Sequence, residues 1–151
     1  MKRVFSGFDG IEGGYEMEPG ERRVVLKSKG GSIVVVDTIS YVNENDRGNV
    51  VVGGSHFGKI CGDQTSKFQP KGVILNDAGK GKDNAGIQGI FVLEKVGIPA
   101  ATVSAMSARI GDGLSSYEEG EISFVNEAAR KLGIAPGMRA SEAARRMLEV
   151  K

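Results

Sequence analysis

The amino-acid sequence predicts a single α/β domain over residues 1–151, in which helices flank a mainly parallel sheet in a Rossmann-like arrangement of three layers. Three observations lead to this prediction. Short apolar runs occur at 50–53, 72–76 and 100–104, and runs with so little alternation are typical of strands buried on both faces. Segment 83–96, between the last two runs, completes a strand–helix–strand unit. Because 40% of the residues are hydrophobic, a chain of this length can bury a core without a disulfide or a metal.

Residues 1–48 are expected to form a β-rich, antiparallel N-terminal extension of the core that residues 49–151 build. Segments 22–27 (RRVVLK) and 32–41 (SIVVVDTISY) are rich in β-branched residues, which favour strands. Lys29-Gly30-Gly31 predicts a hairpin turn between them.

The helices are predicted from capping residues and apolar spacing. Asp83 is expected to cap the helix over 83–96, and Gly97 to end it. Residues 56–68 are expected to form a loop with a short helix. Ser116 and Glu119 resemble a capping box that begins another helix. Ser141 is expected to cap a last helix. The apolar faces of both helices are interpreted as core packing. The first helix contributes Ile122, Val125, Ala129 and Leu132 and ends at Gly133, and the second contributes Ala144, Met147 and Leu148.

The composition excludes several classes of protein. Lys and Arg number 20 against 19 Asp and Glu, and this balance predicts no nucleic-acid partner. Cys61 has no second cysteine to pair with, which fits a reducing compartment. The sequence shows no apolar leader segment and no membrane-length apolar run, so we expect a cytoplasmic protein without a membrane partner. Apolar helices on a chain this small make a homo-oligomer the expected assembly.

Three glycine-rich loops follow the three apolar runs, at 53–58 (GGSHFG), 76–84 (NDAGKGKDN) and 104–116 (SAMSARIGDGLSS). Parallel strands all end at the same edge of a sheet, and open α/β sheets bind ligands beyond that edge. The loops are therefore expected to bring together one set of polar side chains, with Asp37 beneath them: Ser55, His56, Asp77, Lys80, Lys82, Asp83, Ser107, Arg109 and Asp112.

His56 and Asp77 are the predicted catalytic residues. His56 is the one histidine and lies in a loop, where an imidazole that titrates near neutrality suits acid–base work. Asp77 directly follows a buried strand. The alternatives are a surface histidine without a role and an aspartate that only forms a turn. Cys61 lies five residues after His56, but an incidental thiol is the preferred interpretation over a nucleophile.

The other loop residues are predicted to bind a ligand. Segment 79–83 (GKGKD) offers backbone N–H groups and two lysines to an anion, although it matches neither the P-loop nor the dinucleotide fingerprint. Arg109 presents a fork that fits a carboxylate or a phosphate. The alternatives are a solvated loop for 79–83 and a salt bridge to Asp112 for Arg109.

No metal is required by the sequence. Asp77, Asp83 and Asp112 supply the oxygen atoms that Mg²⁺ prefers, so Mg²⁺ is a possible cofactor. Capping and turn formation explain the same residues without it. One histidine and one cysteine cannot build the usual site for a transition metal.

The loop sequences resemble those of a group of small bacterial and archaeal proteins of uncharacterised function. The resemblance rests on Gly54-Ser55-His56, on 76–87 (NDAGKGKDNAGI) and on 107–113 (SARIGDG) with Ser116-Tyr117-Glu118, and it covers about two-thirds of the chain. It implies a family pattern in these loops and no mechanism.

Together these features favour an enzyme that acts on a small metabolite bearing a carboxylate or a phosphate. The alternatives are a non-catalytic metabolite-binding or regulatory module, and a structural subunit of a homo-oligomer. The substrate and the reaction are left open.

Overall fold

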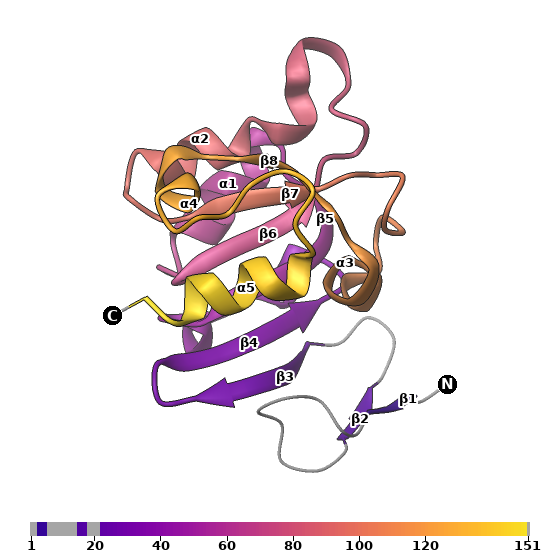
Figure 1. Ribbon diagram of the computed structural model, residues 1–151, viewed down its shortest axis with the longest axis vertical. Helices are drawn as coiled ribbons and strands as arrows, with labels where there is room; N and C mark the ends of the chain where they lie inside the picture. The colour runs from indigo at the N-terminus through magenta and orange to yellow at the C-terminus, as the bar shows by residue number, and fades with distance from the viewer. Residues whose placement is uncertain (1–2, 6–14, 18–21, 151) are drawn as a thin grey trace.

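A computed structural model describes residues 3–5, 15–17 and 22–150 (Figure 1). Six strands form one sheet in the order β3-β4-β5-β6-β7-β8. Their bounds are Arg23–Ser28 (β3), Gly31–Val36 (β4), Val50–His56 (β5), Gly72–Asn76 (β6), Ala100–Val103 (β7) and Ile122–Val125 (β8). Two further short strands, β1 (Arg3–Phe5) and β2 (Tyr15–Met17), pair antiparallel in a sheet of their own.

The centre of the sheet is parallel and its two outer strands are antiparallel. β4, β5, β6 and β7 run in the same direction, whereas β3 is antiparallel to β4 and β8 to β7. The predicted α/β class and hairpin at Lys29-Gly30 are confirmed. The predicted division at residue 48 places β4 wrongly in the antiparallel extension, because Val34 pairs with Val51 in the parallel core.

One face of the sheet carries every connection between the parallel strands. Val34, Val51, Val73 and Ala100 are paired across four neighbouring strands and therefore point to the same face. The covering elements are the 3₁₀ turns η1 (Ile39–Tyr41) and η2 (Glu44–Asp46), helix α1 (Lys59–Ser66) and helix α2 (Gly89–Glu94). The order of the strands consequently follows the chain without a reversal, unlike the doubly wound order of a Rossmann fold.

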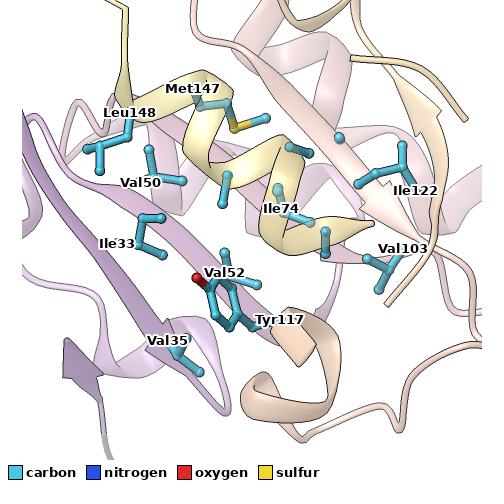
Figure 2. Close-up of a cluster of buried hydrophobic side chains, with 14 of the residues drawn as sticks. Ile33, Val35, Val50, Val52, Ile74, Val103, Tyr117, Ile122, Met147 and Leu148 are labelled. Atoms are coloured by element: carbon cyan, nitrogen blue, oxygen red, sulfur yellow. The ribbon is translucent and has the colours of Figure 1, made fainter. Parts of the chain in front are cut away.

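The opposite face is covered by α3 (Gly113–Glu119) and α5 (Ala140–Leu148), which makes the third layer. Figure 2 shows Met147 and Leu148 of α5 over Val50, and Tyr117 of α3 beside Val52. The inward face predicted for the last helix is confirmed, since Ala144, Met147 and Leu148 are all buried. The predicted cap at Ser141 is wrong, because α5 begins at Ala140 after the N-cap Arg139, and Ser141 lies inside the helix.

The helix predicted after Ser116 is wrong. Ser116 lies inside α3, whose N-cap is Asp112, and Ile122–Val125 is strand β8 rather than helix. The spacing misled because β8 contains a bulge: Thr102 pairs with Phe124 but Val103 pairs with Ile122, so Ser123 is an extra residue. Ile122 and Val125 thus pack on the same core cluster at a spacing that resembles a helix. Between β8 and Gly133, only Glu127–Arg130 (α4) is helical.

The helix predicted over 83–96 is shorter than expected. α2 covers Gly89–Glu94, and the 3₁₀ segment η3 (Lys82–Ile87) precedes it. Asp83 and Asn84 both have a φ of 56°. This is the left-handed region, which aspartate and asparagine tolerate. Asp83 lies inside η3, whose N-cap is Gly81, and it therefore does not cap a helix. Gly97, with a φ of 75°, does follow the end of the helix as predicted.

None of the helices in the described ranges is long and apolar enough to cross a membrane.

Candidate functional site

The four parallel strands end at one edge of the sheet, and the predicted loops follow them there. Asp37 comes after β4, Ser55 and His56 end β5, Asp77 follows β6, and Ser104 follows β7. The paired ends of the strands bring these loops together, as His56 pairs with Asn76 and Asn76 with Val103.

Two glycines let the loop after β7 fold back onto β5 and β4. The amide of Gly111 donates to the carbonyl of Gly54 at 2.7 Å. A Cβ atom on Gly54 would lie 2.3 Å from the amide nitrogen of Asp112, and one on Gly113 would lie 2.1 Å from the carbonyl oxygen of Val36. Both contacts are with backbone, which cannot move aside as a side chain can. Glycine is therefore required at both positions for the loop to reach this place.

Asp77 is buried, with 3% of its surface exposed, and its carboxylate holds three loops together. Oδ1 accepts from the amides of Gly79 at 2.7 Å and Ala105 at 3.0 Å, and Oδ2 accepts from the Ser123 hydroxyl at 2.8 Å. These three contacts explain its place in the fold. Its predicted role as a proton exchanger stays a prediction.

Four other predicted residues also take part in hydrogen bonds within the protein. Asp37 accepts from the amide of Gly113 at 3.0 Å, and the Ser55 hydroxyl accepts from the amide of Ile39 at 3.0 Å. The Ser107 hydroxyl accepts from the amide of Glu121 at 2.9 Å. Asp112 accepts from the amide of Ser115 at 3.0 Å and so caps α3. The structure thus uses much of the predicted set to fix the loops.

Arg109 is 65% exposed and forms two ion pairs. Its Nε atom donates to Asp112 at 3.3 Å, which is the salt bridge considered from the sequence, and its Nη2 atom lies 3.2 Å from Oε1 of Glu119. The Ser115 hydroxyl donates to the same Oε1 atom at 2.7 Å and accepts from the amide of Arg109 at 3.0 Å. Ser115 therefore fixes the position of the arginine backbone and of the glutamate.

Arg109 and Glu119 border an open pocket of about 500 Å³ between the loops after β6 and β7 and helix α3. Met106 and Ile110 form an apolar wall, and they are 96% and 59% exposed. The rest of the lining is small: Ala78, Ala105, Ser107, Ala108 and Ser115. The volume falls within the roughly 300–1,000 Å³ that is usual for sites that bind small molecules.

His56 does not line this pocket. Its ring is at the beginning of α1, where Nδ1 accepts from the amide of Gly58 at 3.0 Å and both ring nitrogens lie 3.9 Å from Sγ of Cys61. In the neutral ring the proton is therefore on Nε2. Burial raises the pKa of the Cys61 thiol above its usual value, and the nearby amide of Gly58 opposes this in part.

The loop after β6 has an unusual backbone. Four residues other than glycine have a positive φ there: Ala78 (52°), Lys80 (69°), Asp83 (56°) and Asn84 (56°). Lys82 and Asp83 are exposed, and Nζ of Lys80 lies 5.7 Å from the centre of the Phe124 ring. Within the described ranges, no three His, Cys, Asp or Glu side chains form a group that could hold a metal ion, so Asp77, Asp83 and Asp112 do not assemble the carboxylate set considered for Mg²⁺.

The sequence did not indicate Ser115, Glu119 or Ser123 as parts of the site. Ser115 and Glu119 are four residues apart on one helix, a spacing that brings side chains together. A helix that begins at Ser116 leaves Ser115 outside it, so the predicted helix does not contain this pair. Ser123 carries no comparable signal, because its contact with Asp77 depends on the bulge in β8.

Neither a family model, nor a curated protein, nor a solved structure gives a significant match to this chain.

Proposed function

We propose that this protein binds a small metabolite with a carboxylate or phosphate group in the pocket beside Arg109. The observation that carries the proposal is this arginine, the one cation among the residues that line the pocket, next to the apolar Met106 and Ile110. Its two ion pairs use Nε and one donor on Nη2. Because the arginine side chain is 65% exposed, these ion pairs are weak, and the N–H donors of the guanidinium are available to a ligand.

The loops support the binding role because they are fixed before a ligand arrives. Asp77 holds the amide of Ala105, Gly54 accepts from Gly111, and Asp112 caps α3. A site whose backbone is already ordered loses less conformational entropy when the ligand binds.

Catalysis is the second candidate, with His56 as the acid–base residue. The observation in its favour is the ring itself, which is exposed and is oriented by the amide of Gly58, so that Nε2 carries the proton of the neutral form. In this proposal Asp77 supports the loops from beneath. Because His56 is not among the residues that line the pocket, binding is the better supported function.

A thermal-shift panel tests the binding proposal. The ligands are phosphate, sulfate, sugar phosphates, nucleotides and dicarboxylates, with and without Mg²⁺. A ligand at a hundred times its Kd adds about 2.7 kcal/mol of stability, or roughly 5–10 °C in Tm at this size. The comparison is Arg109→Ala with Arg130→Ala, since Arg130 is also 65% exposed and ion-paired but lies on α4. A shift that only Arg109→Ala loses supports the proposal, and a shift that all three proteins share contradicts it.

His56→Gln separates the two candidates once a ligand is known. A variant that binds the ligand normally but loses its turnover supports catalysis. Binding by the wild type without any product favours the non-catalytic role.

A further inference from the structure

The pocket presents two charges of opposite sign. Among the residues that line it, only Arg109 and Glu119 are charged, and their Nη2 and Oε1 atoms are 3.2 Å apart. A ligand that approaches the guanidinium therefore also meets a carboxylate. The hydroxyl of Ser115 donates to Glu119 at 2.7 Å and keeps that carboxylate in place.

This pairing discriminates against a simple anion. Arg109 and Glu119 are 65% and 53% exposed, so their ion pair is weak and opens at little cost. An anion that takes Arg109 leaves Glu119 unpaired beside a like charge. A ligand with a carboxylate and an ammonium group on one carbon atom instead replaces one ion pair with two and brings no net charge.

The remaining lining suits an apolar substituent on that ligand. Met106 and Ile110 are the two large apolar side chains of the loop, and both are largely exposed beside the charged pair. A methionine side chain is flexible and adapts to different apolar groups. Covering these side chains removes apolar surface from water, which favours binding.

We propose that the ligand is an α-amino acid with an apolar side chain. Its carboxylate binds Arg109, its ammonium group binds Glu119, and its side chain contacts Met106 and Ile110. This inference rests on the proposed function, because it names the class of metabolite that the same pocket takes.

Titration calorimetry on the full chain tests it with four organic probes, and inorganic phosphate is titrated alongside as a test of the proposed function. L-leucine has all three features, 4-methylpentanoate lacks the ammonium group, leucinamide lacks the carboxylate, and glycine lacks the apolar side chain. Wild type is expected to bind leucine most tightly. Glu119→Gln should weaken leucine binding about tenfold, the loss of one charge-assisted bond, and should not weaken 4-methylpentanoate. Glu127→Gln, which breaks the ion pair with Arg130, should change neither.

Three outcomes overturn the inference while the proposed function survives. They are equal binding of leucine by wild type and Glu119→Gln, tighter binding of 4-methylpentanoate than of leucine by wild type, and equal binding of glycine and leucine. If wild type binds neither leucine, nor 4-methylpentanoate, nor inorganic phosphate, the proposed function fails as well. The Tm of Glu119→Gln, measured alongside, verifies that the variant is folded.

Discussion

At the scale of single residues, the site depends on side chains that satisfy buried backbone groups. Asp77 is the main example, because its two oxygen atoms accept from Gly79, Ala105 and Ser123. Removing an acceptor leaves donors in a buried region without a partner, which costs more than the hydrogen bond itself contributes.

Asp77→Ala should therefore lower the free energy of unfolding by about 2–4 kcal/mol, measured by urea denaturation. Ser123→Ala removes one donor and should cost about 1 kcal/mol. The control is Asp83→Asn in the same loop, where the side chain is exposed, asparagine tolerates the same positive φ, and the expected change is within about 0.5 kcal/mol. Equal effects at Asp77 and Asp83 would contradict the supporting role of Asp77.

Cys61 gives a prediction on pH. Burial raises the pKa of its thiol in the folded protein above the ordinary value of 9.0, so the unfolded chain loses its proton first. The stability that the protonated thiol contributes is present below that value and is lost as the pH rises through the higher folded pKa. Between pH 7 and the alkaline range, wild type should lose more free energy of unfolding than Cys61→Ala. Parallel losses in the two proteins would exclude this effect.

The candidate residues could be predicted from the sequence only in part. Arg109 and Asp112 are three residues apart, and their salt bridge was among the expected alternatives. His56 was expected beside Asp77 because both follow neighbouring strands. Its ring lies instead at the beginning of α1. This position could not be predicted, because the sequence does not determine which side of the sheet a side chain takes at a strand end.

At the scale of elements, the loop over 78–84 carries the clearest strain. A side chain in the left-handed region costs about 1–2 kcal/mol, whereas glycine adopts the same φ freely. Ala78 has a φ of 52° and an exposed side chain, so it loses little contact when it is replaced.

Ala78→Gly should raise the free energy of unfolding by about 0.5–1 kcal/mol, after the entropy that glycine gains in the unfolded chain is subtracted. Ala128→Gly makes the same change inside α4 and should lower it by about 0.5–1 kcal/mol. Thermal unfolding of both variants measures the two signs. Destabilisation by Ala78→Gly would show that the backbone of this loop is not strained.

The elements themselves were predictable where burial decides them. The runs at 50–53, 72–76 and 100–104 became β5, β6 and β7, because strands covered on both faces need continuous apolar sequence. The structure of segment 122–132 was not predictable, because the bulge at Ser123 gives the apolar residues of β8 the spacing of a helix. Hydrogen bonds to β7 determine the conformation there, and no local pattern reports them.

At the scale of the whole molecule, α5 covers one face of the sheet. Two methionines, one buried under this helix and one exposed, show how much that packing contributes to the free energy of unfolding. Met147 is fully buried on α5, and Met106 is 96% exposed in the loop after β7. Met147→Ala should lower the free energy of unfolding by about 2–5 kcal/mol through the cavity it leaves. Met106→Ala should change it by less than about 0.5 kcal/mol. Denaturant unfolding compares them, and similar values would mean that α5 is not packed on the sheet.

The class of fold was predictable at this scale, and the order of its strands was not. Apolar runs and an intervening helix indicate a parallel sheet, but they fit either a reversing or a sequential order. In the sequential order found here there is no crevice at a reversal point. The pocket lies instead where the loop after β7 folds back, and the two close contacts at Gly54 and Gly113 make that path possible.

The position of α5 along the chain also bears on how the protein is made. The strands of the six-stranded sheet are synthesised in the same order in which they lie in the sheet. Each new strand can therefore pair with the one made just before it, and the sheet can grow one strand at a time. The face over Ile33, Val50 and Ile74 stays bare throughout, because α5 follows every one of these strands. A growing chain thus exposes this apolar surface, which is prone to aggregation, until Ala140–Leu148 has been synthesised. A chaperone that shields apolar surface would act in that interval.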